Sequence, residues 1–275
     1  MGISIGFIQG RLSPIVGGKI QAFPWNNWEK EFEIANKNNF KIMEWTLDQL
    51  DLYENPLMTK DGQNKIKFLS EKYDISISSL TGDCFMQNPF YKVDGITQYN
   101  LLQDFKKIII ACGSLDIKFI VFPLVDNGSL ESKEQEQILK DGLSSVNSLL
   151  QMNDVKIIFE SDFPPARLND FISDFPPEHY GINYDIGNSA ALGYDPAEEI
   201  DLYGNRIKNV HIKDRKLGGT TVPLGEGHAD LARVFKELIK AQYSGNYILQ
   251  TARAKDGDHA YVLCRYRDQV IKWME

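Results

Sequence analysis

Apolar runs rich in β-branched residues alternate with longer segments of helical periodicity along the whole chain. Such runs are typical of buried strands, and segments whose apolar residues recur every three or four positions are typical of helices. The predicted strands are Ile3–Ile8, Phe40–Trp45, Ile75–Leu80, Lys118–Pro123, Val155–Glu160, Tyr180–Asp185, Ile207–Lys213 and Asn246–Thr251. The predicted helices are Asn27–Asn38, Gly62–Tyr73, Ile96–Cys112, Ser132–Met152, Arg167–Ser173, Ala197–Tyr203, Asp230–Ala241 and His259–Met274. Ser132 and Asp195 stand where helix N-caps are expected.

This strict alternation of strand and helix predicts an α/β protein with a parallel sheet. About eight such units fit the chain, which favours closure into a (β/α)8 barrel. The alternative is an open, doubly wound sheet, which usually has a glycine-rich first turn, and no GxGxxG follows the first predicted strand. Barrels of about 250 residues fold as one unit, so we expect residues 1–275 to form a single domain.

Four consecutive predicted strands end in side chains that can bind a metal. The strands are apolar and end in Glu160, Asp185, His211 and Gln250. In a closed barrel alternate residues point inward, and inward side chains at the carboxyl ends of the strands form the floor of the active site. The four side chains are therefore expected to meet around one divalent ion. Mixed oxygen and imidazole ligands suit Mn²⁺, Mg²⁺, Co²⁺ or Zn²⁺.

The formal net charge of −8 disfavours one class of partner. Proteins that bind duplex nucleic acid usually carry a basic face, so no nucleic-acid partner is expected. An acidic total is compatible with an anionic small molecule, because a local group of cations dominates the field within one cleft.

The cysteines indicate a reducing compartment. Cys84, Cys112 and Cys264 are odd in number, far apart and without CxxC spacing, so we expect free thiols. The first residues lack the pattern of a signal peptide, and no apolar run reaches the roughly 18 residues of a membrane span. The expected location is the cytoplasm, without membrane contact.

Several short motifs, in order and at barrel spacing, resemble those of the sugar phosphate isomerase/epimerase family, the xylose isomerase-like barrels. They are Gly6–Leu12, Met43–Trp45, Phe159-Glu160, Asp185–Asn188, His211–Asp214 and Val222–Gly227. The resemblance covers nearly the whole chain and is closest to the L-ribulose-5-phosphate 3-epimerase and D-tagatose 3-epimerase branch. It implies a metal-dependent enzyme acting on a sugar or sugar phosphate. It also implies a homo-oligomer, since members of the family commonly form dimers or tetramers.

The metal ligands that the resemblance implies match at three positions and depart at the fourth. The family uses Glu, Asp, His and Glu, which fall here on Glu160, Asp185, His211 and Gln250. Gln250 can coordinate through its amide oxygen but cannot accept a proton as a base. This brings the usual epimerisation by two glutamates into question. With a neutral Gln250, the four ligands carry a formal charge of −2. We therefore expect weaker metal affinity and a stronger Lewis acid.

Glu160 is the candidate catalytic base, because a carboxylate beside an acidified C–H bond suits proton abstraction. The alternative is that Glu160 only binds the metal. The second proton carrier stays open among Glu44, Asp83, Lys213 and a bound water. Nothing in the sequence ranks these four.

Further residues are candidates for binding the substrate. Lys213, Arg215 and Arg253 place three cations near the last two strands, where barrels often bind phosphate. The alternative is that these cations form ion pairs with acidic residues at the surface. The full set of candidates is Arg11, Glu44, Asn188, Lys213, Arg215, Glu226 and Arg253.

Three functions are therefore compatible with the sequence. The leading hypothesis is a metal-dependent isomerase or epimerase that acts through an enediolate. A dehydratase or lyase would use the same metal with one base. A non-catalytic sugar-binding protein would explain the loss of the fourth carboxylate.

Overall fold

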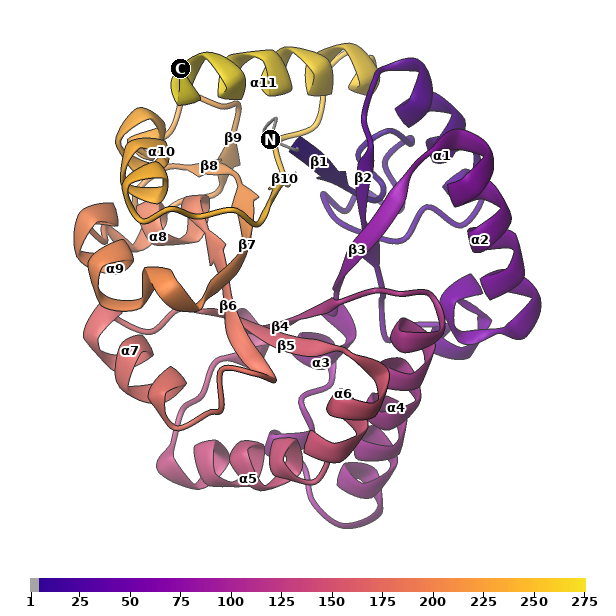
Figure 1. The fold of residues 1–275 in the computed structure, drawn as a ribbon, viewed down its shortest axis with the longest axis vertical. Helices are drawn as coiled ribbons and strands as arrows, with labels where there is room; N and C mark the ends of the chain where they lie inside the picture. Colours follow the sequence, from indigo (N-terminus) through magenta and orange to yellow (C-terminus); the bar gives the residue numbers. More distant parts are fainter. Residues whose placement is uncertain (1–4) are drawn as a thin grey trace.

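A closed barrel of parallel strands forms the centre of the molecule (Figure 1). The computed structural model describes residues 5–275. The barrel strands are β1 (Ile5–Ile8), β2 (Ile42–Thr46), β3 (Ser76–Thr81), β4 (Phe119–Leu124), β5 (Lys156–Ser161), β6 (Tyr180–Asp185), β7 (Ile207–Ile212) and β10 (Asn246–Leu249). This confirms the predicted (β/α)8 barrel, although Ile3 and Ser4 of the first predicted strand lie outside the described residues. Because β1 pairs with β10, strands from both ends of the chain close one ring, and we infer a single domain.

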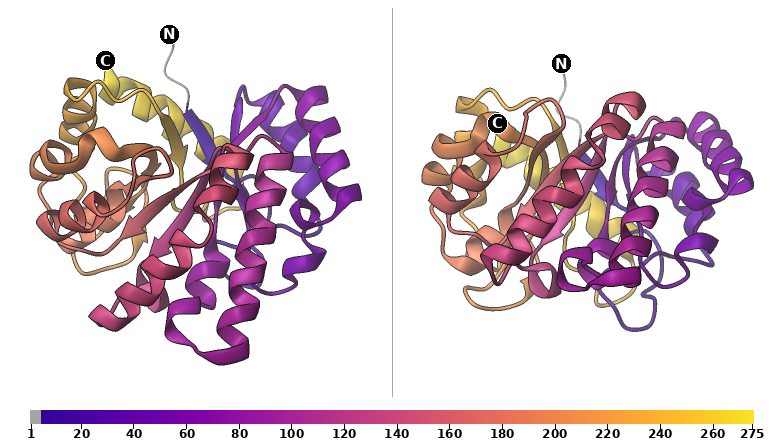
Figure 2. Two further views of the ribbon diagram at one scale, coloured as in Figure 1. Left: turned by 60° about the horizontal axis from the view of Figure 1, so that its bottom comes forward. Right: turned by 90° about the horizontal axis from the view of Figure 1, so that it is seen from below.

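Helices surround this barrel on the outside (Figures 1 and 2). The longer ones are α1 (Trp28–Lys37), α2 (Lys60–Tyr73), α4 (Gly95–Ser114), α5 (Lys133–Ser144), α6 (Asn147–Asn153), α7 (Pro165–Ser173), α9 (Pro196–Tyr203), α10 (Leu231–Lys240) and α11 (His259–Met274). Two predicted caps are confirmed, since Ser132 accepts from Gln135 N at 3.2 Å and Asp195 accepts from Ala197 N at 2.8 Å. Among residues 5–275, no helix combines the length and apolar content that crossing a membrane requires.

The structure corrects the prediction of one long helix over Ser132–Met152. The helix is interrupted between α5 and α6, where the Ser145 hydroxyl donates to Gly142 O at 2.6 Å. Serine hydroxyls compete in this way with the backbone hydrogen bonds of a helix. The sequence also gave no signal for two short helices at strand ends, α3 (Asp83–Gln87) and α8 (Ile186–Leu192), or for the hairpin of β8 (Asp214–Arg215) and β9 (Thr221–Val222).

Aromatic side chains fill the layer between barrel and helices. Phe159, which is fully buried on β5, contacts the rings of Phe122, Phe171, Phe175 and Tyr180 at centroid distances of 6.2, 5.2, 5.2 and 6.0 Å. Such ring pairs add to the stability that burial of their apolar area provides. The main core of the protein therefore lies outside the strands.

The inside of the barrel holds a small apolar cluster and a polar layer. Ile8, Ile42 and Ile248 form the cluster. The polar layer joins strands that are not neighbours, since Glu44 on β2 bonds to His211 on β7. Ile248 pairs with His211 across β10 and β7, and Ile8 pairs with Glu44 across β1 and β2. Paired residues of parallel strands point to the same face, so all of these side chains point into the barrel.

We expect Phe159→Ala to lower the free energy of unfolding by about 3–5 kcal/mol, because it leaves a cavity among four aromatic rings. Denaturant titration measures the change. The control is Met152→Ala at a side chain that is 82% exposed, which should stay within about 0.5 kcal/mol of the parent protein. Equal effects of the two variants would contradict the assignment of the core to this layer.

Candidate functional site

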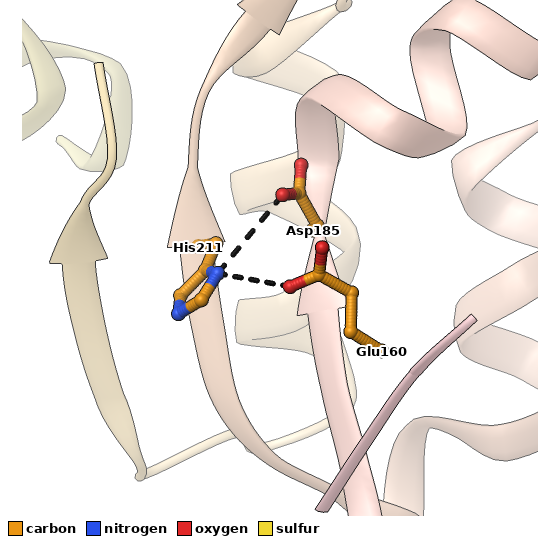
Figure 3. Close-up of side chains that lie close together, drawn as sticks. All are labelled: Glu160, Asp185 and His211. Atoms are coloured by element: carbon orange, nitrogen blue, oxygen red, sulfur yellow. Dashed lines mark ion pairs between the residues drawn. The ribbon is translucent and has the colours of Figure 1, made fainter. Parts of the chain in front are cut away.

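Three polar side chains from neighbouring strands meet at the carboxyl end of the barrel (Figure 3). His211 Nδ1 lies 3.1 Å from Glu160 Oε2 and 4.0 Å from Asp185 Oδ2. One potential ligand atom from each residue lies within 4.8 Å of the others, and all three residues are buried. The predicted convergence of Glu160, Asp185 and His211 is therefore present. Two carboxylates and an imidazole at this spacing are able to hold a divalent metal ion.

The ring of His211 is oriented from below by Glu44. Glu44 Oε1 lies 2.7 Å from Nε2 of His211 and also accepts from Thr81 Oγ1 at 2.7 Å. The other oxygen of Glu44 accepts from Ser79 Oγ at 2.7 Å and Asn209 Nδ2 at 3.0 Å. A carboxylate bonded to one ring nitrogen fixes the tautomer and turns the other nitrogen toward a metal. With the proton on Nε2, the lone pair of Nδ1 faces Glu160 and Asp185.

Two asparagines hold the carboxylate of Glu160. Asn183 Nδ2 donates to Oε2 at 2.8 Å, and Asn188 Nδ2 donates to Oε1 at 2.7 Å. Asp185 caps α8, since its Oδ1 accepts from the backbone N–H of Asn188 at 2.9 Å. The start of this short helix therefore fixes Glu160 and Asp185 together.

Gln250 lies at the end of the strand next to that of His211 and lines the cavity. It follows β10, and its backbone N–H donates to Ile212 O at 3.0 Å, just beyond the level of His211. Its side chain lines the same cavity as Glu160, and its Oε1 is buried without a hydrogen-bond donor among residues 5–275. A buried amide oxygen is unfavourable unless it has a partner. A cation or a ligand donor bound in the cavity would satisfy this oxygen.

The charges of the site favour a bound cation. Burial alone lowers the pKa of His211, but the carboxylates of Glu44 and Glu160 outweigh it and raise that pKa to about 10. Burial raises the pKa of Asp185, although Lys213 opposes this. For Glu160, burial is outweighed by His211 and Lys213, and its pKa is lowered. The proton on His211 and the ammonium group of Lys213 therefore balance the negative charge of the carboxylates. A bound metal ion would supply this positive charge in their place.

A cavity of about 520 Å³ opens beside these residues. It is lined by Arg11, Ile20, Gln21, Thr81, Asp83, Met86, Gln87, Val121, Pro123, Val125, Asp126, Glu160, Asn188, Lys213, Arg215, Thr220, Thr221 and Gln250. A volume of this size is ordinary for a small-molecule site.

Three of the predicted cations line the cavity, and each has protein partners. Lys213 Nζ lies 2.5 Å from Asp185 Oδ2. Arg215 Nη1 donates to Asn188 Oδ1 at 2.8 Å. Arg11 Nε donates to Thr251 O at 2.9 Å, and burial together with nearby Arg253 lowers the pKa of Arg11 to about 9.

Three other predicted binding residues are not part of the cavity wall. Glu44 is fully buried, with both oxygens bonded, so we correct its role from substrate contact to support of His211. Arg253 donates to the carbonyls of Gly10 and Ser13 and stabilises the loop after β1. Glu226 is exposed on the loop before α10.

The polar support inside the barrel was not predicted from the sequence. Asn183 and Asn209 bond to each other at 2.8 Å and to Glu160 and Glu44 respectively. The available signal was parity, because Asn183 lies two residues before Asp185 and Asn209 two residues before His211. Polar residues that repeat at this spacing in an otherwise apolar strand face the same interior.

Fold and site together define a parallel barrel with a buried carboxylate–imidazole group at its mouth. Residues 32–263 match the family described as xylose isomerase-like TIM barrel, and the chain belongs to that family. It is 24% identical to the L-ribulose-5-phosphate 3-epimerase UlaE of Escherichia coli (strain SMS-3-5 / SECEC) over 253 residues, which cover 88% of each chain. The sequence-based resemblance is thereby confirmed.

Solved structures show the same fold at low identity. A xylose isomerase domain protein from Planctomyces limnophilus has a TM-score of 0.75 at 13% identity, with 98% of this chain and 96% of that chain covered. D-psicose 3-epimerase from Clostridium cellulolyticum H10, solved with D-tagatose, has a TM-score of 0.73 at 13% identity, with 99% and 98% covered.

We expect Glu44→Gln to weaken binding of Mn²⁺ by about 10–100-fold. The NH2 group of the glutamine would face side chains that now donate to Glu44, and the ring of His211 would lose the hydrogen bond that orients it. Isothermal titration calorimetry measures the affinity. The control is Glu33→Gln at an exposed carboxylate on α1, which should bind like the parent. Unchanged affinity of a folded Glu44→Gln protein would exclude the orienting role.

We expect Gln250→Glu to tighten Mn²⁺ binding by about tenfold or more. A unit charge about 4 Å from another contributes several kcal/mol at an effective dielectric constant near 20, and desolvation of the new carboxylate offsets part of this. The control is Gln151→Glu at an exposed position of α6. Equal or weaker affinity of the Gln250→Glu protein would show that Gln250 is not a ligand.

Proposed function

We propose that this chain is an isomerase or epimerase that uses one divalent metal ion to act on a ketose or ketose phosphate. One observation carries the proposal: Glu160, Asp185 and His211 meet at the mouth of the barrel, and Glu160 shares a cavity wall with Gln250, whose buried Oε1 has no hydrogen-bond donor among residues 5–275. Ligands of this kind suit Mn²⁺, Mg²⁺, Co²⁺ or Zn²⁺. A bound ion of this class would polarise the carbonyl of the substrate and stabilise negative charge on its oxygen.

Glu160 is the base in this proposal. Its carboxylate lies at the cavity wall, and two asparagines hold it in one orientation. The carbon next to a polarised carbonyl loses its proton most readily, and a fixed carboxylate within reach is suited to accept it. The product of this step is an enediolate of the sugar.

The substrate class follows from the charges of the cavity and from the relatives. Arg11, Lys213 and Arg215 give one wall positive charge, which suits a sugar with an anionic end group. The relative UlaE is named for L-ribulose 5-phosphate, and D-psicose 3-epimerase was solved with D-tagatose. A ketose phosphate and a free ketose are therefore the two substrates to compare.

The cellular setting is part of the proposal. Cys84, Cys112 and Cys264 are free thiols, which favours a reducing compartment such as the cytoplasm. The expected partner is a small molecule rather than nucleic acid, in keeping with the net charge of −8. A homo-oligomer is proposed from the family resemblance alone, and light scattering in solution tests it.

The test is exchange of a carbon-bound proton with deuterium oxide, followed by NMR. L-ribulose 5-phosphate, D-tagatose and D-psicose are incubated with the Mn²⁺-loaded protein, and we expect at least one to gain deuterium beside its carbonyl. Glu160→Gln should lower this exchange by about 10²–10⁴-fold, because it removes the base. The control is Glu178→Gln, an exposed glutamate just before β6 and therefore at the opposite end of the barrel.

Three results would contradict the proposal. Exchange that persists in Glu160→Gln would exclude Glu160 as the base. Tight binding of a ketose without exchange would make the chain a sugar-binding protein, and formation of a dehydrated product would make it a lyase.

A further inference from the structure

Epimerisation requires a proton to leave one face of a carbon and another proton to arrive on the opposite face. Glu160 serves one face, but Gln250 cannot carry a proton. The other titratable side chains in the cavity wall are Arg11, Asp83, Asp126, Lys213 and Arg215. The arginines stay protonated near neutral pH, Lys213 is paired with Asp185, and Asp126 is exposed to solvent. Asp83 is the remaining group.

Asp83 lies across the mouth of the barrel from His211. It follows β3 and begins α3, and β3 stands four places from β7 in either direction around the ring. Between Asp83 and Glu160 runs β4, from which Val121 and Pro123 line the cavity. The two carboxyl groups therefore flank an apolar strip, on which the carbon skeleton of a sugar has room to lie.

The surroundings of these two carboxyl groups differ. Glu160 accepts hydrogen bonds from Asn183 and Asn188, whereas Asp83 is half-buried and lines the cavity. Burial raises the pKa of Asp83 to about 7, and the charges of Asp48 and Glu160 add to this effect, while His211 opposes it. A carboxyl group with such a pKa holds its proton for much of the time near neutral pH. Carboxyl groups whose environments drive their pKa values apart are typical of an acid and a base that work together.

We propose that Asp83 is the second proton carrier of the epimerase reaction and replaces the carboxylate that is absent at position 250. The inference rests on the proposed function. Glu160 takes the proton from the carbon beside the carbonyl, and the electron pair of the C–H bond moves into the enediolate. The carboxylic acid of Asp83 then gives its proton to the same carbon from the other face, which reforms the carbonyl and inverts the centre. Glu160 ends protonated and Asp83 ionised, and exchange of one proton with solvent restores both.

The experiment measures two rates for each protein in deuterium oxide with Mn²⁺ and L-ribulose 5-phosphate, D-tagatose or D-psicose. One rate is deuterium gain in the starting ketose, and the other is formation of its epimer. Asp83→Asn should lower epimer formation by at least about 100-fold, while deuterium gain in the starting ketose persists through Glu160. Glu160→Gln should lose both rates. Asp170→Asn, an exposed acid on α7, is the charge-matched control.

Different failures are distinguishable. Asp83→Asn that forms epimer at the parental rate overturns the assignment of Asp83 and leaves the proposed function intact. Equal loss of both rates with a raised KM makes Asp83 a binding residue and also overturns it. Absence of exchange in the parent protein with all three ketoses overturns the proposed function, and the role of Asp83 with it.

Two further measurements complement the Asp83→Asn variant, and the second uses only the parent protein. Asp83→Glu keeps a carboxyl group, so it should form epimer faster than Asp83→Asn. In the parent protein the first epimer molecules should carry deuterium at the inverted carbon, because their new proton comes from a group in exchange with solvent. Retention of the original proton in those first molecules would mean that one group serves both faces, and Asp83 would be excluded.

Discussion

A buried histidine held between two carboxylates organises the mouth of this barrel. Glu44 bonds to Nε2 of His211 at 2.7 Å from below, and Glu160 Oε2 lies 3.1 Å from Nδ1. Buried charges are unfavourable unless each has a partner, so the ring and the two acids constrain one another strongly. The direction of Nδ1, the position of Glu160 and the shape of the cavity floor all follow from this arrangement.

The polar layer occupies space that other barrels use for packing. Branched apolar side chains usually fill the interior of a (β/α)8 barrel in layers, but here Glu44, Asn183, Asn209 and His211 form a buried network of hydrogen bonds. Among residues 5–275, Ile8, Ile42 and Ile248 form a small apolar cluster inside the strands. Stability must therefore come mainly from the aromatic layer outside, around Phe159, and the interior is left to support the site.

The cavity is asymmetric in charge. Lys213 and Arg215 follow β7 on one side, while Asp83 follows β3 on the other, and Glu160 lies between them around the ring. Gln250 adds a neutral oxygen where a fourth carboxylate would have raised the negative charge beside the proposed metal ion. This combination is consistent with a moderately held, strongly polarising cation and with proton transfer that involves the β3 side of the mouth.

The sequence by itself determined the fold class and three of the residues that converge. Apolar runs and helical periodicity depend on local chemistry, so β6 and α11 begin and end where the sequence predicts. Polar residues at the ends of apolar strands must lie at one edge of a parallel barrel, and for that reason Glu160, Asp185 and His211 were predictable together. The break between α5 and α6 was missed because it depends on the Ser145 hydroxyl, which competes with helical hydrogen bonds only weakly and only in context.

Only the tertiary structure decided which polar residues face the cavity and which support it. Glu44 and Arg253 resemble binding residues in the sequence, yet one bonds to His211 inside the barrel and the other to carbonyls of the loop after β1. Asp83 became distinct from the other acids only through its place in the cavity wall, its raised pKa and its position across the ring from β7. Sequence periodicity gives the face of a strand on which a side chain lies. The partner that it meets there depends on the closure of the barrel, which brings together residues more than 150 positions apart, such as Glu44 and His211.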